Sequence, residues 1–296
     1  SSDVCSSDLR IIIDIVEAKK NSLILIDEVE MGLHPKIQRR LMDVIRNVSR
    51  KDNKQFILTS HSPTILDSVC LNSRIFIEKD NVGNYKAIQN ISVNAALTKM
   101  DSKSFPLIDL YCEDNEAKKI ILKGIKNVSV KFNLNNFKEL INVISVGSAD
   151  KTYKCFESDI SSYNHKKIKT GCGCVLDGDM KLVKNSAGKL SFPKNDNLHF
   201  LYSNECPEKF LTKIYLDENP NINIQYYYDN ENPHYLFQTI IDNSNLTNKY
   251  EVFETCWNYF IETDNGKIYL EELTDFLKNL VLKYSPDLWK TAYNTF

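Results

Sequence analysis

Carboxylates follow three apolar segments of the chain. Asp27 and Glu28 follow residues 23–26, Glu113 follows residues 107–112, and Asp177 and Asp179 follow residues 172–176. Neighbouring residues of a strand point to opposite sides, so one carboxylate of the first pair can hold a metal ion while the other faces a nucleophilic water. Phosphoryl transfer needs both tasks. A solvated strand end is the alternative interpretation of a lone Asp-Glu pair.

Two histidines accompany the first pair. His61 follows a second apolar segment, residues 56–59, and from the end of a neighbouring strand it could contact a γ-phosphate and report its loss. His34 directly precedes Pro35, where a helix is expected to begin. The order of strand, acids, helix, strand and histidine therefore indicates a nucleotide site.

Residues 23–35 read Leu-Ile-Leu-Ile-Asp-Glu-Val-Glu-Met-Gly-Leu-His-Pro, and residues 57–63 read Ile-Leu-Thr-Ser-His-Ser-Pro. The first segment resembles the Walker B and D-loop of ABC-type ATPases, in the branch of RecF, SMC and OLD-like proteins. The second resembles the switch-histidine segment of the same group. The resemblance implies that Asp27 binds Mg²⁺, Glu28 is the general base and His61 is the switch, with His34 completing the ATP-binding set.

Two parts of that ATPase pattern are missing. No Gly-x-x-x-x-Gly-Lys-Ser/Thr loop occurs, and the signature helix expected just before Ile11 is replaced by residues 1–9, a near-repeat of Ser-Ser-Asp. We therefore expect residues 1–9 to be a non-native, frayed head and residues 10–100 to be the C-terminal part of an ATPase domain. On this interpretation the chain alone does not hydrolyse ATP.

The second group of carboxylates predicts a metal site. Glu113, Asp177 and Asp179 end strands of a β/α series, and the carboxyl ends of parallel strands meet at one edge of a sheet. Carboxylates that meet there repel one another unless a cation is bound. Oxygen ligands suit Mg²⁺ or Mn²⁺, and one or two such ions can activate water for phosphodiester cleavage. The alternative for residues 177–179 is a tight turn.

Three segments in order resemble the Glu, Gly and Asp-x-Asp motifs of Toprim domains: residues 110–118, 143–147 and 175–179. The resemblance implies that Glu113, Asp177 and Asp179 hold the metal. OLD-family nucleases often carry a further acid four residues after the Glu, where this chain has Ala117. Either Asp114 or Glu116 could replace it.

A later segment, Cys206-Pro207-Glu208-Lys209, resembles a Pro-Glu segment of these nucleases. It implies that Glu208 is an additional metal or supporting acid and that Lys209 contacts phosphate. Lys181 and Lys184 flank the acids and could also contact DNA phosphates, although a solvated face is an equal alternative. The tyrosines at residues 226–228 could stack on bases, but a surface turn or core packing is the favoured interpretation.

The elements that position these groups predict an α/β fold. A partial ATPase sheet, with a short buried strand over residues 23–26 and a hairpin over residues 74–79 and 84–91, is followed by a linker near residues 98–104. A parallel-sheet Toprim domain over residues 101–205 and a helical tail over residues 206–296 come next, and the helices expected in the tail include residues 249–262 and 286–294. A net charge of −2 excludes a general polycation, and the apolar runs are too short to span a bilayer. With no export signal, the eight cysteines are expected to be reduced thiols in a cytoplasmic protein, and the Cys172-x-Cys174 pair to be strand packing.

An ABC-type ATPase followed by Toprim is the order found in the OLD (overcoming lysogenisation defect) family. The resemblance covers about residues 10–210 and implies an ATP-regulated, metal-dependent DNA endonuclease that dimerises through its ATPase domain, with a possible defence-system partner and an antiphage or DNA-processing role. One alternative is a non-nucleolytic, ATP-driven DNA-binding module with a degenerate Toprim site. Another is a primase or topoisomerase core, although no separate domain with a nucleophilic Tyr is evident.

Overall fold

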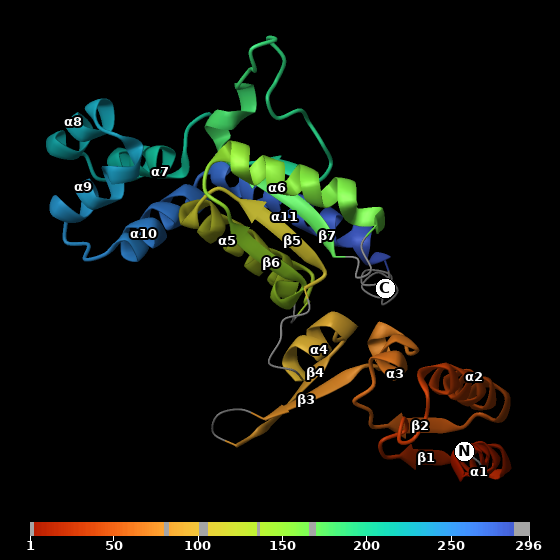
Figure 1. Cartoon of the computed structure of the whole chain (residues 1–296). Coiled ribbons are helices and arrows are strands. Elements are labelled where there is room, and N and C mark those ends of the chain that lie inside the picture. Colours follow the sequence, from red (N-terminus) through yellow and green to blue (C-terminus); the bar gives the residue numbers. More distant parts are fainter. Residues whose placement is uncertain (1–2, 80–82, 101–105, 135–136, 166–169, 287–296) are drawn as a thin grey trace. The chain divides into compact units, whose positions relative to one another are not determined.

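The computed structural model describes residues 3–79, 83–100, 106–134, 137–165 and 170–286 (Figure 1). The chain divides into two compact units, Ser1–Ser102 and Lys103–Phe296. Helices and strands alternate in both, so the predicted α/β class is confirmed. Among the described residues, no helix combines the length and the apolar character needed to cross a membrane.

The first unit contains two small sheets and their covering helices. Its elements are α1 (Asp3–Glu17), β1 (Leu23–Ile26), α2 (Pro35–Asp52), β2 (Gln55–Leu58), α3 (Pro63–Asp67), η1 (Leu71–Ser73), β3 (Ile75–Lys79), β4 (Tyr85–Gln89) and α4 (Val93–Met100). Strands β1 and β2 pair in parallel, whereas β3 and β4 form the expected antiparallel hairpin. Part of the predicted hairpin turn, and most of the predicted linker, lie outside the described residues.

Helix α1 corrects one expectation. The segment 1–9 is expected to have no regular structure, yet α1 begins at Asp3 and continues without interruption to Glu17. Ser and Asp are tolerated in the first turn of a helix, and the downstream apolar residues anchor it. Ile15 is buried, and Ile11 and Ile12 pack against the same core as Leu41 and Ile45 of α2.

Strand β1 is not buried as a whole, contrary to the expectation from its apolar run. Leu23 and Leu25 are 55% and 68% exposed, and Ile57 of β2 is 59% exposed. Ile26, Phe56 and Leu58 point to the other face, where they pack against the core formed with α1 and α2. The described part of the unit therefore covers only one face of this two-stranded sheet, so a continuous apolar run does not by itself imply burial on both sides.

The second unit is built on a four-stranded sheet. Its elements are β5 (Ile108–Cys112), α5 (Asn115–Lys131), η2 (Phe137–Leu140), β6 (Ile141–Ser145), α6 (Ala149–Ser162), η3 (Tyr163–His165), β7 (Gly171–Leu176), η4 (Gly178–Leu182), β8 (Leu198–Phe200), α7 (Pro207–Glu218), α8 (Ile222–Asn230), η5 (Pro233–Tyr235), α9 (Leu236–Asp242), α10 (Lys249–Glu262) and α11 (Asp264–Tyr284). The strand order is β6-β5-β7-β8, and every neighbouring pair is parallel.

Strand β7 is buried on both faces. Cys172, Cys174 and Leu176 pack against α6, through residues such as Phe156. The alternate residues of the strand face α11, which covers the other side of the sheet with α5 (Figure 1). The two cysteines thus serve as small apolar residues, as predicted, and the seven cysteines whose side chains are described are all free thiols.

The helical region after β8 packs onto this sheet and around its own aromatic core. Phe210 of α7 and Phe260 of α10 lie with their ring centroids 5.4 Å apart, and Tyr202 contacts both rings. The tyrosines of residues 226–228 lie in helix α8, where the sequence predicts a turn or core packing. The helix expected over residues 286–294 lies, apart from its first residue, outside the described residues.

Candidate functional site

The ends of β5 and β7 bring the predicted Toprim-like acids together. The two strands are parallel neighbours with Cys112 opposite Val175, so Glu113 and Asp177 leave the sheet at the same edge. The backbone N–H of Asp177 donates to Glu113 Oε1 at 2.7 Å. Gly147, at the end of β6, donates its N–H to the Glu113 carbonyl at 2.8 Å and has a φ of 127°, which favours glycine.

Asp177 is a buried carboxylate whose Oδ1 has no hydrogen-bond partner among the described residues. Burial, followed by the neighbouring charges of Glu113, Asp114, Asp179 and Glu208, raises the pKa of Asp177 to about 9. Burial likewise raises the pKa of Glu113 to about 7, although N–H groups of the backbone oppose the shift. Among the described residues, the charges that shift the pKa of Asp177 are all acidic.

Asp179 lies in the short helix η4, immediately after Asp177 and Gly178. A Cβ on Gly178 would meet the backbone oxygens of Ser203, Tyr202 and Leu201 at 2.5, 2.6 and 3.0 Å. Only glycine therefore allows the two acids to turn so close to the segment after β8. Burial raises the pKa of Asp179 as well.

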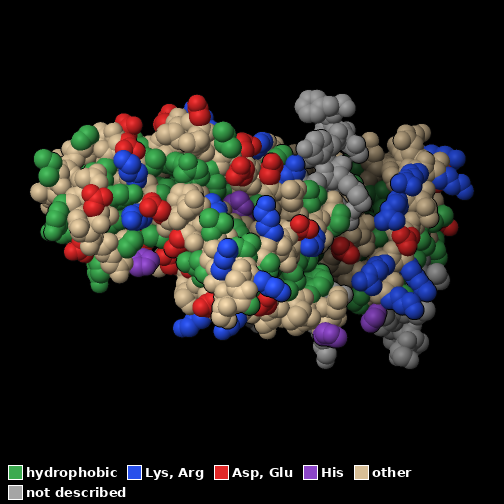
Figure 2. Space-filling view, turned by 90° about the horizontal axis from the view of Figure 1, so that it is seen from above, with side chains coloured by type: hydrophobic (Ala, Val, Ile, Leu, Met, Phe, Trp, Pro, Cys, Tyr) green, Lys and Arg blue, Asp and Glu red, His purple; other side chains and the backbone are tan. Residues whose placement is uncertain are grey.

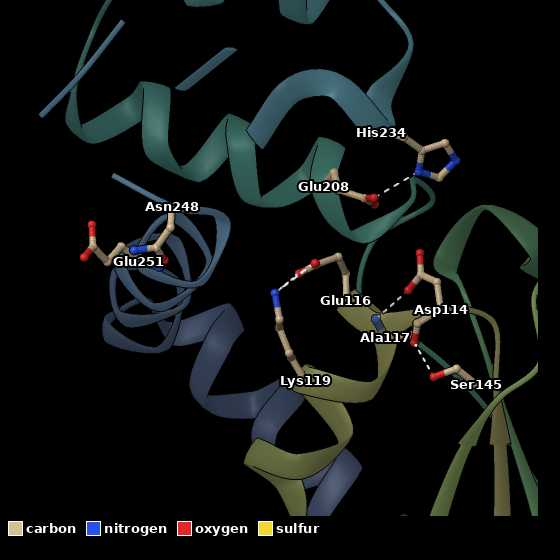
Figure 3. Close-up of polar contacts among 9 residues, drawn as sticks. All are labelled: Asp114, Glu116, Ala117, Lys119, Ser145, Glu208, His234, Asn248 and Glu251. Atoms are coloured by element: carbon tan, nitrogen blue, oxygen red, sulfur yellow. Dashed lines mark hydrogen bonds and ion pairs between the residues drawn. The ribbon is translucent and has the colours of Figure 1, made fainter. Parts of the chain in front are cut away.

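A second group of potential ligands, drawn in Figure 3, includes Asp114 and Glu208, whose charges act on Asp177. Glu208, in the first turn of α7, is 6% exposed, and His234 of η5 places its Nδ1 2.9 Å from Glu208 Oε1. Asp114 is the N-cap of α5 and accepts the Ala117 N–H at 2.8 Å. One potential ligand atom from each of Asp114, Glu208 and His234 lies within 4.8 Å of the other two.

The structure distinguishes between the two acids that could replace the acid missing at Ala117. Glu116 is paired with Lys119, whose Nζ lies 2.9 Å from both carboxylate oxygens. Asp114 instead lies with Glu208 and His234. Asp114 is therefore the better placed of the two.

The three candidate DNA-binding lysines lie in different surroundings. Lys181 donates to the Ser203 carbonyl at 2.6 Å, and burial lowers its pKa. Lys209 lies 3.7 Å from Glu205 and over the ring of Tyr228 at 5.3 Å from its centroid. Lys184 is exposed. Two of the three are thus held by contacts within the protein, which leaves Lys184 as the most accessible.

In the first unit, Thr59 connects the acids that follow β1 to the end of β2. The Thr59 hydroxyl donates to Asp27 Oδ1, and the Glu28 N–H donates to the same hydroxyl oxygen at 2.8 Å. Both acids are exposed, and Glu28 has a φ of 46°, which is uncommon for a residue with a side chain. The parallel pairing of β1 and β2 therefore holds both carboxylates at one end of the sheet.

The histidines of the first unit have different positions. The His61 N–H donates to Glu30 Oε1 at 2.6 Å, so the end of β2 is fixed to the segment after β1. Burial alone would raise the pKa of Glu30, but hydrogen bonds from Ser60 and His61 lower it. His34 is the exposed N-cap of α2, where its Nδ1 accepts from the Lys36 N–H at 3.4 Å. The backbone of His61 is thus held beside the segment that carries Asp27 and Glu28, whereas the side chain of His34 caps its own helix.

The basic side chains are distributed unevenly between the two units. All six arginines precede residue 75, and exposed Lys and Arg gather over the first unit, at the right-hand end of Figure 2. Over the second unit, acidic and basic side chains alternate on the visible face. On the face that Figure 2 shows, an anionic partner would therefore meet more positive charge over the first unit.

Two functional candidates were missed by sequence reasoning. His234 lies 26 positions after Glu208 and joins it only because η5 folds back onto α7. Glu30 was within the motif of residues 23–35, but its role in holding His61 depends on the pairing of β1 with β2. The only local signal for His234 was the Asn232-Pro233 pair, which starts a short helical turn.

The donor set of the second unit fits a divalent cation. The potential ligands are mainly carboxylate oxygens, and two buried ones, Asp177 Oδ1 and Glu208 Oε2, have no hydrogen-bond partner among the described residues. An unpartnered buried carboxylate oxygen is costly unless a cation neutralises it. Mg²⁺ and Mn²⁺ are the ions that such oxygen ligands suit.

Comparison with known proteins bears on the first unit. A family model described as "AAA domain, putative AbiEii toxin, Type IV TA system" matches residues 7–67, about a fifth of the 296 residues. The match contains Asp27, Glu28, His34 and His61. No match was found among curated proteins. Residues 7–67 therefore form an ATPase-like region of the ABC/AAA type.

Proposed function

We propose that this chain is part of an ATP-regulated, divalent-metal-dependent DNA endonuclease of the OLD type, with a Toprim-like catalytic unit over residues 103–296. The observation that carries the proposal is the convergence of Glu113, Asp177, Asp179 and Glu208 around buried carboxylate oxygens that lack partners. A parallel sheet with acids at the carboxyl ends of adjacent strands supports the same conclusion.

Each residue of the proposed site has a distinct task. Glu113, Asp177 and Asp179 would hold a Mg²⁺ or Mn²⁺ ion, and Glu113 also orients the Asp177 backbone by accepting its N–H. Glu208 would hold or support an ion from the side of α7. A bound ion would supply Lewis acidity and lower the pKa of an attacking water. The exposed Lys184 would attract the DNA phosphates directly. Lys181 and Lys209 would do so after giving up their contacts with Ser203 and Glu205.

The first unit would supply nucleotide control. Asp27 would hold Mg²⁺ and Glu28 would orient the attacking water, while His61 would respond to the γ-phosphate and His34 would lie at the border of the site. The family match to an ATPase-like region supports this part of the proposal. Dimerisation through this unit, and a partner from a defence system, belong to the same proposal.

Nicking of supercoiled plasmid DNA by the purified full chain tests the nuclease proposal. With Mn²⁺, the wild-type chain should convert supercoiled plasmid to nicked and linear forms, and a chelator should stop the conversion. Asp179→Ala should lower the rate by about a hundredfold or more, because metal-supporting residues act on that scale. Asp217→Asn, on the same helix as Glu208 but at an exposed position where Asp217 pairs with Lys213, should cleave like wild type.

Equal nicking by the wild type and Asp179→Ala would show that the cleavage comes from elsewhere and would contradict the proposal. Absence of nicking, together with retained DNA binding, would instead favour the non-nucleolytic module.

A further inference from the structure

We propose that Asp114, Glu208 and His234 form a distinct metal position with a nitrogen donor, one that prefers first-row transition ions such as Mn²⁺, Co²⁺ or Zn²⁺ to Mg²⁺. The inference deepens the proposed function and rests on it, since both require the acids of the second unit to bind cations. Its new element is His234, which adds an imidazole to a site otherwise made of carboxylates.

Three separate elements converge to build this position. Asp114 lies at the start of α5, Glu208 in the first turn of α7 and His234 in η5. The ligand atoms lie within 4.8 Å of one another, which is compatible with a common ion. Figure 3 shows the His234 ring and the Asp114 carboxylate on the same side of Glu208.

A second observation shows that the cluster is more than a set of exposed charges. Glu208 is 6% exposed, and its Oε1 contacts His234 while its Oε2 has no hydrogen-bond partner among the described residues. A salt bridge alone would explain the contact of Oε1 but not the unsatisfied, buried Oε2. A cation bound beside the pair would satisfy that oxygen.

The orientation of the other two ligands is also fixed. One oxygen of Asp114 accepts from Ala117, which holds the carboxylate and engages only one of its two oxygens. Asn232 accepts the His234 N–H through its side chain at 3.1 Å, which fixes the backbone that carries the imidazole. Hydrogen bonds of this kind orient metal ligands and increase metal affinity.

The chemistry of the donors determines the ion. Two carboxylates and a neutral imidazole carry a charge of −2, which balances a divalent cation. Mg²⁺ prefers oxygen ligands and retains water, whereas imidazole favours transition ions and increasingly so along the series from Mn²⁺ to Cu²⁺. The acids of the β5 and β7 ends offer only oxygen, so the two positions should differ in selectivity.

Calorimetric titration of the metal-free full chain with Co²⁺ and, separately, with Mg²⁺ tests this assignment, with the visible absorption of Co²⁺ as a second readout. His234→Gln should weaken binding of one Co²⁺ ion by about tenfold or more and change the Co²⁺ absorption spectrum, with Mg²⁺ binding altered less than about twofold. His165→Gln, a substitution at an exposed histidine of η3, is the matched control and should titrate like wild type.

Two further results separate this inference from the proposed function. If Asp177→Asn weakens Mg²⁺ binding while His234→Gln leaves the Co²⁺ isotherm and spectrum as in wild type, the nitrogen-containing position is wrong and the proposed site stands. If neither variant changes the binding of either ion, both are overturned. His234 is exposed, so circular dichroism of His234→Gln should match wild type and exclude misfolding as the cause of lost binding.

Discussion

Asp177 shows at the scale of one residue how a site can oppose the stability of the fold that holds it. The carboxylate is buried and beside Glu113, and its Oδ1 has no partner among the described residues. The same burial that raises its pKa makes the charged form costly. Such a conflict between local environment and residue type is expected where a ligand completes the environment.

His199 provides a pH test that is separate from the metal ligands. Its ring stacks on Phe276 and Tyr269 at centroid distances of 5.0 and 6.0 Å, and its Nε2 has no hydrogen-bond partner among the described residues. Burial, with a contribution from the charge of Lys181, lowers the pKa of His199 to about 4. The unfolded chain therefore takes up the proton first, and stability is present above pH 6.5 and lost as the pH falls towards 4.

Urea unfolding at pH 7 and pH 5 measures this effect. Between these two pH values wild type should lose about 2 kcal/mol more stability than His199→Phe, which retains an aromatic ring but cannot be protonated. Both proteins are measured with chelator, so that bound metal does not contribute. Equal losses in the two proteins would show that His199 is not protonated on unfolding in this range.

Single residues of the site were predictable to the extent that they follow a strand. Glu113, Asp177 and Asp179 were identifiable because apolar runs and acids appear in order along the chain. The contact of His234 with Glu208 was not, since it depends on how η5 folds against α7. Long-range contacts of this kind leave no periodic pattern in the sequence.

Among the elements, the end of helix α1 depends on a buried lysine. Lys54 is 2% exposed, and its Nζ donates to the carbonyls of Ile15 and Val16 at 3.0 Å each. These carbonyls belong to the last turn of α1, where the helix itself supplies no donors. Lys54, which directly precedes β2, therefore connects the start of that strand to the end of α1 and helps to hold Ile15 in the core of the first unit.

Replacing this lysine should open the end of α1. Lys54→Met retains the length of the side chain but removes the donor from the buried carbonyl of Ile15 and the partly buried carbonyl of Val16, at a cost of about 2 kcal/mol. Hydrogen exchange of residues 10–17 should accelerate by about thirtyfold as a result. Lys51→Met, at an exposed position of α2, should not change it, and unchanged exchange in Lys54→Met would refute the capping role.

Element boundaries were predicted well where periodicity is strong and poorly where tertiary packing decides. The strand over residues 23–26 and the helix over residues 249–262 match β1 and α10. The burial of β1 was wrong because the described residues cover only one face of its sheet. Helix α8 was missed because consecutive tyrosines carry no helical period and its N-cap, Asn221, also suits a turn.

At the scale of the whole molecule, each of the two units carries its own group of acids. The first unit contains the ATPase-like region, and the second has its own core and the acid cluster. Both place acids at the carboxyl ends of parallel strands, as the order of motifs in the sequence predicted. The packing of α7 to α11 around the second site could not be predicted, since amphipathic helices specify a buried face without specifying its partner.

The central claim is that Glu113, Asp177, Asp179 and Glu208 of the second unit bind a divalent cation. The most direct test compares the thermal stability of wild type and Asp177→Asn, each measured with chelator and with Mn²⁺. In chelator at pH 7, Asp177→Asn should be at least as stable as wild type, because the raised pKa leaves Asp177 uncharged without metal and the amide has nearly the same shape as the protonated carboxyl group. Mn²⁺ at about a hundred times its dissociation constant should stabilise wild type by about 2.7 kcal/mol and the variant far less. A variant that is less stable than wild type in chelator, and that responds equally to Mn²⁺, would contradict the account.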